Sequence, residues 1–221
     1  MLVAFLDAEK GRIARCCHDM ARAFSRGATL IAYGTGAAAT DAAHVAVEFM
    51  HPVIVGKRAL PALAPANDPT DFSTLGRLAK PGDIALAIAH GREDGRLEDF
   101  LREARSSGLL TIALAGAGVR ADHVFSVPSD DPAIVQEVQE TTYHVLWELV
   151  HVFFEHPGLL SEACITCGDV AVEARVVEVR GHTAVIEKDG AHEEVATDLV
   201  GGVEAGDTVL CHAGVVLERL E

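Results

Sequence analysis

Apolar and polar residues alternate in two different ways along this chain of 221 residues. Between residues 2 and 154, short apolar runs are separated by longer segments in which apolar residues recur every three or four positions. The short runs predict buried strands and the longer segments predict helices. From residue 164 onward the period changes to two, with turn residues between short runs, which predicts β-strands. This change of pattern predicts two domains, residues 1–158 and 164–221.

The first domain has the pattern of alternating strands and helices. A doubly wound α/β fold with a parallel sheet follows from that alternation. The segment 61–71 is long for a simple connection, which makes it a candidate active-site loop. The predicted strands are 30–33, 52–55, 83–89, 109–114 and 124–127, and the predicted helices are 2–24 (as one or two helices), the segment after residue 36, 95–107 and 131–154.

The second domain contains several short runs of alternating apolar and polar residues. Arg180-Gly181-His182, Lys188-Asp189-Gly190 and Ala205-Gly206-Asp207 are turn signals between them. A small β-barrel or an open sandwich is expected from such closely spaced strands. The predicted strands are 174–179, 183–187, 195–197 and 208–212.

The charge and the cysteines restrict the classes of function. A net charge of −15 argues against nucleic acid or an anionic membrane as a partner, because both attract basic surfaces. No apolar run has the length of a membrane span, and the first residues lack the features of a signal peptide. Five cysteines without a secretory signal indicate reduced thiols and a cytoplasmic location.

The first predicted strand leads through Gly34-Thr35-Gly36 into an alanine-rich helix. A strand, a loop of small residues and a helix in this order present backbone N–H groups to an anion. The helix carries His44 and Glu48, and a spacing of four places both on one face. This pattern is typical of one half of a site.

The helix predicted over 131–154 carries a polar line on an otherwise apolar sequence. Its members are Gln136, Glu140, His144 and Glu148, at steps of four. One interpretation is a solvated face with pairing between neighbouring turns. The other is that the line supplies the second half of the site.

Residues 27–154 resemble the sugar isomerase (SIS) domain, and within it the phosphoheptose isomerase branch. Gly34 to Phe49 reads GTGAAATDAAHVAVEF, against the family form GxGGSAADAxHxxxEF, and Val127-Pro128-Ser129-Asp130-Asp131 precedes a helix with Gln136-Glu137 as in that family. The resemblance implies that His44, Glu48, Gln136 and His144 bind zinc or another divalent metal. It also implies that Glu48 and His144 transfer the proton between adjacent sugar carbons. The other interpretation is a hydrogen-bonded polar cluster without an ion.

The phosphate-holding loops depart from the family pattern. The family has a serine-rich loop of the type STSGNS after the second strand, where this chain has Ala89-His90-Gly91-Arg92-Glu93-Asp94. Glu93 and Asp94 would repel a phosphate dianion, and Arg92 and Arg96 would offset that only in part. In the first loop, Ala38 replaces a serine and Thr35 an asparagine. The remaining candidate ligand-loop residues are Gly34, Thr35, Gly36, His90 and Arg92.

Residues 164–221 resemble the HypC/HupF hydrogenase-assembly chaperones. The stretch Val203 to Leu220, VEAGDTVLCHAGVVLERL, carries the resemblance through the family pattern VGDxVLVHxG. It implies an OB-like β-barrel that passes an iron–cyanide–carbonyl group from an assembly scaffold to the large-subunit precursor of nickel–iron hydrogenase. His212 matches the family histidine, and Cys164 and Cys167 are candidates for the family cysteine. A redox pair and a structural role remain as alternatives for these two thiols.

The leading hypothesis from the sequence is therefore a hydrogenase maturation protein with a metal-binding, isomerase-like domain. One alternative is an aldose–ketose isomerase acting on a sugar phosphate of the sedoheptulose 7-phosphate type. Another is a protein that binds a sugar phosphate without catalysis. Resemblance alone implies a homodimer or homotetramer, and the sequence leaves open whether the first domain is an enzyme.

Overall fold

The computed structural model describes most of the chain. It divides into two compact units, Met1–His151 and Val152–Glu221, which are considered separately below. The described residues are 1–65, 79–91, 95–116, 118–156, 160, 171–188, 190–212 and 214–220.

The first unit is built on a five-stranded parallel sheet with the strand order β2-β1-β3-β4-β5. The central strands β1, β3 and β4 are almost entirely buried, as expected for a parallel sheet that is covered on both faces. The α/β prediction is confirmed. The strands are β1 (Leu30–Gly34), β2 (Ala62–Leu63), β3 (Ile84–Ile88), β4 (Leu110–Leu114) and β5 (His123–Phe125).

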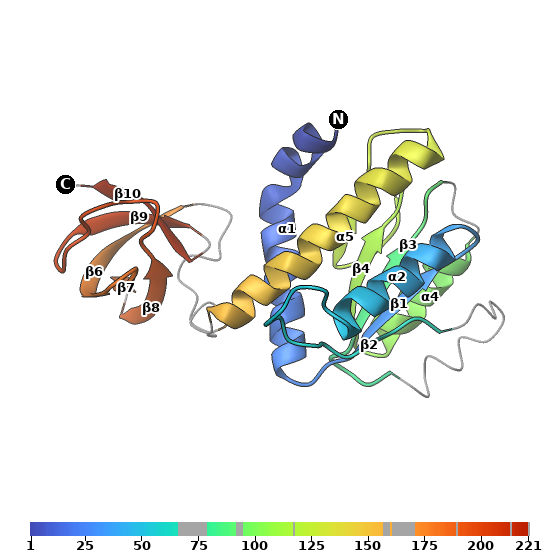
Figure 1. Cartoon of the computed structure of the whole chain (residues 1–221), viewed down its shortest axis with the longest axis horizontal. Helices are drawn as coiled ribbons and strands as arrows, with labels where there is room; N and C mark the ends of the chain where they lie inside the picture. Colours follow the sequence, from blue (N-terminus) through green and yellow to red (C-terminus); the bar gives the residue numbers. More distant parts are fainter. Residues whose placement is uncertain are drawn as a thin grey trace. The chain divides into compact units, whose positions relative to one another are not determined.

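Helices lie on both faces of this sheet. Helix α4 covers one face, and α1, α2 and α5 lie on the other (Figure 1). The second group is joined by the stacked rings of Phe24 and Phe49, whose centroids are 5.6 Å apart, and by a hydrogen bond from Trp147 Nε1 to the carbonyl oxygen of Glu48. The four helices are α1 (Leu2–Ser25), α2 (Ala38–Met50), α4 (Arg96–Ser106) and α5 (Pro132–Glu155).

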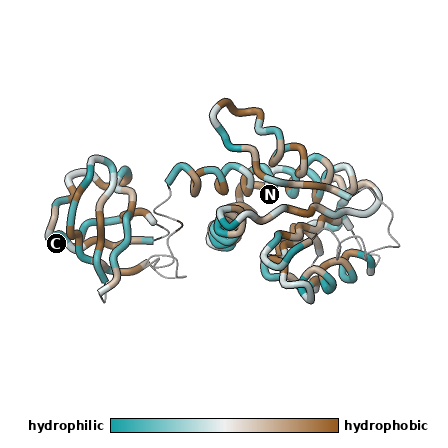
Figure 2. The backbone as a smooth tube through the Cα atoms, turned by 90° about the horizontal axis from the view of Figure 1, so that it is seen from below, coloured by the Kyte–Doolittle hydropathy of each residue, from teal (hydrophilic) through white to brown (hydrophobic). Residues whose placement is uncertain are grey.

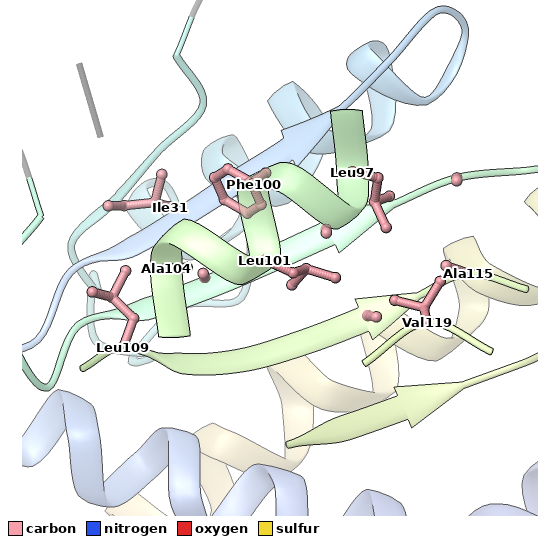
Figure 3. Close-up of a cluster of buried hydrophobic side chains, with 12 residues drawn as sticks. Ile31, Leu97, Phe100, Leu101, Ala104, Leu109, Ala115 and Val119 are labelled. Carbon is pink, nitrogen blue, oxygen red and sulfur yellow. The ribbon is translucent and has the colours of Figure 1, made fainter. Parts of the chain in front are cut away.

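The core between α4 and the sheet shows why the strand sequences are continuously apolar. Ile31 of the sheet lies beside Phe100 of α4 (Figure 3). Ala85 and Ala87 belong to the same buried cluster. Successive strand residues alternate between faces, so Leu30 and Leu86 are buried on the opposite side. Small alanines on the sheet leave room for the larger side chains of the helix.

The prediction of a strand at residues 52–55 is wrong. Val53 and Val55 are 78% and 101% exposed. The edge strand that pairs with β1 is β2, which lies further along the sequence. The amide of Leu30 donates to the carbonyl oxygen of Pro61 over 2.9 Å, which begins this pairing. The start of the expected 61–71 loop is thus an edge strand, and residues 66–71 lie outside the described residues.

The second unit contains a closed five-stranded barrel with the order β10-β8-β7-β6-β9. The pairing is antiparallel except between β10 and β8, so the barrel is mixed. Hydrophobic and hydrophilic residues alternate along these strands (Figure 2). The expected small barrel is confirmed, with a further strand at the C-terminal end. The strands are β6 (Val172–Arg180), β7 (Thr183–Lys188), β8 (Ala191–Ala196), β9 (Thr208–His212) and β10 (Val215–Leu220).

Inward-facing residues of the barrel form one apolar core. Val176, Ala184, Ile186, Val209 and Val216 are at most 1% exposed within it. The register shifts in β6 and β10 are bulges that bend these strands, and bending of this kind helps a short sheet to close on itself.

None of the helices in the described part of the chain combines the length and the apolar character needed to cross a bilayer.

Candidate functional site

The loop between β1 and α2 is built around glycine. A Cβ atom on Gly34 would lie 2.2 Å from the carbonyl oxygen of Ala38, and Gly36 has a left-handed φ of +58°. The amides of Ala38 and Ala39 donate to the carbonyl oxygens of Thr35 and Gly36 in a tight turn. The loop therefore requires these two glycines for its backbone path, whatever it binds.

His44 and Glu48 lie side by side on α2, one helical turn apart. Nε2 of His44 is 3.3 Å from Oε1 of Glu48, as their spacing of four predicts. Both side chains are partly exposed, His44 to 38% and Glu48 to 17%. The pair therefore remains open to a ligand.

Helix α5 brings His144 and Tyr143 against His44. The ring centroids of His44 and His144 are 5.2 Å apart, and the Tyr143 hydroxyl oxygen lies 3.1 Å from Nδ1 of His44. Residues from two distant helices thus converge on one point. Tyr143 is a contact that sequence reasoning missed, because a tyrosine on an apolar helix gives no signal beyond core packing.

Glu140 joins the two histidines. One ligand atom from each of His44, Glu140 and His144 can be chosen so that all three lie within 4.8 Å of one another. Oε1 of Glu140 is 4.0 Å from Nδ1 of His44. Sequence reasoning placed Glu140 on the polar line of α5 but not among the ligand candidates. Its spacing of four before His144 was the available signal.

Gln136 is turned toward a second cluster beside the first. Its amide nitrogen donates to Asp41, over 3.3 Å to Oδ2 and 3.4 Å to Oδ1, which leaves its amide oxygen as the atom able to ligate an ion. Asp41 Oδ2 is also 2.6 Å from Nε2 of His90, after the end of β3. Gln139 fixes the same strand end by donating from Nε2 to the carbonyl oxygen of Ala89.

Burial and the nearby negative charge both favour the protonated hydroxyl of Tyr143. Burial raises the pKa of Tyr143, and the carboxylates of Asp41, Glu140 and Glu48 raise it further. The hydroxyl therefore keeps its proton at neutral pH. Each of these three carboxylates lies beside a histidine in the pairs described above. When those imidazoles are neutral, the cluster carries a net negative charge.

The donor chemistry of this cluster fits a divalent ion. Imidazole nitrogens with carboxylate oxygens are ligands of zinc, and the same set serves iron and nickel. His44 and His144 lie near the carboxylate of Glu140. Glu48 lies one turn from His44 on α2, and Gln136 lies one turn from Glu140 on α5.

The second unit contributes one described candidate. His212 ends β9, and its Nδ1 is buried without a hydrogen-bond partner among the described residues. The neighbouring Cys211 is fully buried, and burial, together with the charge of Glu193, raises its thiol pKa to about 11. Cys211 thus belongs to the barrel core.

Three of the site residues predicted from the sequence lie outside the residues that the structure describes. Cys164 and Cys167 lie outside the described residues, as does Arg92 of the candidate ligand loop. Within the ligand loop, the structure brings His90 to Asp41 and leaves Gly34, Thr35 and Gly36 in the turn before α2.

Comparison with known proteins identifies the first unit. The chain is 34% identical over 155 residues to a phosphoheptose isomerase of Solidesulfovibrio magneticus, covering 62% of this chain and 76% of that protein. It is 32% identical over 146 residues to a phosphoheptose isomerase of a Roseiflexus species, covering 58% of this chain and 74% of that protein.

Solved structures agree on the fold. A phosphoheptose isomerase from Francisella tularensis superimposes with a TM-score of 0.55 at 22% identity, covering 64% of this chain and 85% of that chain. One from Neisseria gonorrhoeae gives a TM-score of 0.56 at 19% identity, covering 66% of this chain and 89% of that chain. At these identities the likeness is one of fold.

The second unit matches a different family. Residues 170–221 match the sequence model of the HupF/HypC family, which spans the barrel from its first strand to its last. The chain therefore belongs to the phosphoheptose isomerase family through its first unit, with a HupF/HypC domain fused after it.

Proposed function

We propose that this protein is an accessory factor in the maturation of nickel–iron hydrogenase, with a metal-binding first domain. The HupF/HypC match over residues 170–221 carries the proposal. The barrel binds the assembly scaffold or the large-subunit precursor of the hydrogenase. His212, with Cys164 or Cys167, handles the iron–cyanide–carbonyl group, which is cargo in transit.

The first domain binds a divalent metal at the cluster between α2 and α5. Membership of the isomerase family makes His44, Glu48, Gln136 and His144 the ligand candidates, and the geometry adds Glu140. When bound, zinc or another divalent metal would supply Lewis-acid chemistry at these residues. These side chains of the protein would hold that ion.

Metal content tests this part of the proposal. Purified full-length protein retains close to one divalent ion per chain, and His44→Ala loses most of it. Cys167→Ala and His182→Ala retain it, because neither residue lies in the first unit. Equal metal content in the wild type and His44→Ala would contradict the site.

Partner capture tests the maturation role. Tagged full-length protein from hydrogenase-producing cells co-purifies with the scaffold or the large-subunit precursor, identified by mass spectrometry. His212→Ala and the double variant Cys164→Ala/Cys167→Ala reduce the bound iron, while Arg180→Ala, at an exposed surface position, does not. Absence of both partners from the wild-type sample would overturn the maturation role.

A second candidate function is sugar-phosphate isomerisation. The 34% identity to a phosphoheptose isomerase favours it. Glu48 and His144 would then move the proton between adjacent carbons of a sedoheptulose 7-phosphate type of substrate. The acids Glu93 and Asp94, which follow β3 in the sequence, and the loss of the serine hydroxyls there argue against tight phosphate binding. Turnover of sedoheptulose 7-phosphate, abolished by Glu48→Gln, would place this function first.

The same family membership supports a homodimer or homotetramer. Light scattering of the purified chain, at several concentrations, measures this directly. A monomer at all concentrations would contradict it.

A further inference from the structure

A basic cleft lies at the amino edge of the sheet, where the parallel strands begin. Its walls include Ala28 before β1, Asp83 before β3 and Leu110 at the start of β4. His90 follows the end of β3, so it lies at the opposite edge. A strand of five residues separates the two edges by about 15 Å. The cleft is therefore distinct from the candidate site between α2 and α5.

The cleft is large enough for a small organic ligand. Its volume is about 820 Å³, and a second cleft of about 450 Å³ lies beside it, with Arg105 lining both. Pro81 and Leu110 contribute apolar surface to the larger one. Volumes in this range are typical of ligand pockets. The cationic side chains that line the two clefts are Arg22, Arg26, Lys80, Arg102, Arg105 and Arg120.

Helix ends account for only part of this positive charge. Arg22 and Arg105 lie in the last turns of α1 and α4, where a cation complements the helix dipole. Lys80 and Arg120 lie in connecting segments, so the dipole argument does not extend to them. Because the whole chain has a net charge of −15, this gathering of positive charge is a local feature of the molecule.

Two acids in the larger cleft are held by groups inside the fold. Asp83 accepts hydrogen bonds from the amides of Thr29 and Lys80, over 2.8 and 2.7 Å. Asp122 accepts from the amide and the hydroxyl of Thr111, over 2.8 and 2.7 Å. These carboxylates therefore fix the backbone at the starts of the strands.

Asp19 and Glu98 are the other acids of the two clefts. Oδ2 of Asp19 is 2.8 Å from Nε2 of His123, which partners it. Glu98 lies in the first turn of α4, where the helix dipole favours a carboxylate. The cationic side chains outnumber the acids, so the two clefts carry an excess of positive charge.

Three of the cations have no acidic partner in the part of the chain that the structure describes. No described carboxylate oxygen lies within 4.0 Å of the charged groups of Lys80, Arg105 or Arg120. Arg105 instead donates to the carbonyl oxygen of Arg120, which brings its guanidinium to the segment that carries Arg120. Cationic groups gathered in this way are stabilised by a bound anion.

We propose that the two clefts form a binding site for a small organic anion with several closely spaced negative charges, a diphosphate or a tricarboxylate. Arg105 lies between the two clefts and, with Arg120 and Lys80, donates hydrogen bonds to the charged groups. Guanidinium groups pair with phosphate and carboxylate oxygens through the same two-pronged geometry, so both kinds of anion fit. The site goes beyond the proposed function and does not depend on the metal cluster.

Isothermal titration calorimetry of the full-length protein tests this site. Metal is first removed with a chelator, which is then removed too, because the probes, pyrophosphate and citrate, both bind metals. Arg105→Gln and Arg120→Gln each take one positive charge from the clefts. Arg180→Gln is the matched control, since it takes the same charge from an exposed pair with Glu178 in the barrel. Circular dichroism checks that each variant is folded.

The wild type is expected to bind at least one probe, and the tighter probe identifies the ligand as a phosphate or a carboxylate. Arg105→Gln and Arg120→Gln weaken that binding by about 10-fold or more, because each loses a charged hydrogen bond. Arg180→Gln leaves the affinity unchanged. Binding of neither probe by the wild type would overturn the proposal. Equal affinities in the wild type and both cleft variants, or an equal loss in Arg180→Gln, would also overturn it.

Discussion

The carboxylate of Asp41 lies 2.6 Å from Nε2 of His90, and each side chain is only 9% exposed. Asp41 stands in the first turn of α2, and His90 follows β3, so the contact joins a helix start to a strand end. Gln136 of α5 adds its amide nitrogen to the same carboxylate. One buried acid thus connects three elements beside the proposed metal site.

Replacing Asp41 by alanine is expected to lower the free energy of unfolding by about 3 kcal/mol. The change removes the acceptor of the Gln136 amide and the carboxylate that lies against the His90 ring, and the loss of a buried partner costs more than the contact itself contributes. Urea unfolding followed by circular dichroism measures the effect.

Asp7→Ala is the matched control for this prediction. Asp7 pairs with Lys10 on the surface of α1, with both side chains more than 70% exposed. Exposed pairs of this kind contribute less than about 1 kcal/mol. Equal losses in the two variants would mean that the Asp41 contacts do not stabilise the domain.

The local part of the site is predictable from the sequence, and the long-range part is not. A spacing of four fixes the neighbourhood of His44 and Glu48 within one helix. The approach of His144 to His44 depends on how α5 packs on α2, which no local pattern specifies. Resemblance to the isomerases supplied that pairing.

Glu140 and residues 52–55 are two places where the sequence alone does not determine the structure. The polar line on α5 has the same spacing whether it is solvated or binds an ion, so Glu140 had two interpretations. The run Val53-Ile54-Val55 has strand-forming residues, yet it remains exposed because β1 takes its edge partner from Ala62 and Leu63. In both cases tertiary packing decides what the local sequence leaves open.

Gly34→Ala is expected to destabilise the first domain by about 3 kcal/mol or more. The added Cβ atom would lie 2.2 Å from the backbone oxygen of Ala38, and backbone at the start of α2 cannot move without breaking the turn. Gly91→Ala is the control, since a Cβ atom there meets nothing within 4 Å and its φ is not left-handed. Thermal unfolding of the two variants gives the comparison, and similar midpoints would contradict the close approach at Gly34.

Asp19 is expected to make stability fall on acidification. Burial acts to raise its pKa, but hydrogen bonds and charge from His123 and His18 outweigh burial and hold the pKa well below its usual range. A carboxyl whose folded pKa is depressed stabilises the fold above its unfolded pKa of about 4, and that stabilisation is lost as the pH falls through the folded pKa.

The Asp19 contribution is about 1 kcal/mol, because its side chain is 44% exposed and solvent screens the pair. Asp19→Asn removes this contribution, so its unfolding free energy declines less than that of the wild type as the pH falls from about 5 to about 2. Urea unfolding at a series of pH values provides the measurement. Parallel curves for the two proteins would show that the pair with His123 does not contribute.

Cys211 is expected to be inert toward thiol reagents in the folded protein. Its side chain is fully buried in the barrel core, and its pKa of about 11 leaves almost no thiolate at about pH 8, the form that reacts. Cys16 and Cys17 are also fully buried, and burial raises the pKa of both thiols. Cys211→Ala should therefore leave the rapid phase of a reaction with dithionitrobenzoate unchanged in native protein, while removing one thiol from the total in denaturant. A smaller rapid phase in Cys211→Ala would mean that the barrel opens at β9. The Cys16→Ala variant, measured in the same way, shows whether such opening is confined to the second unit.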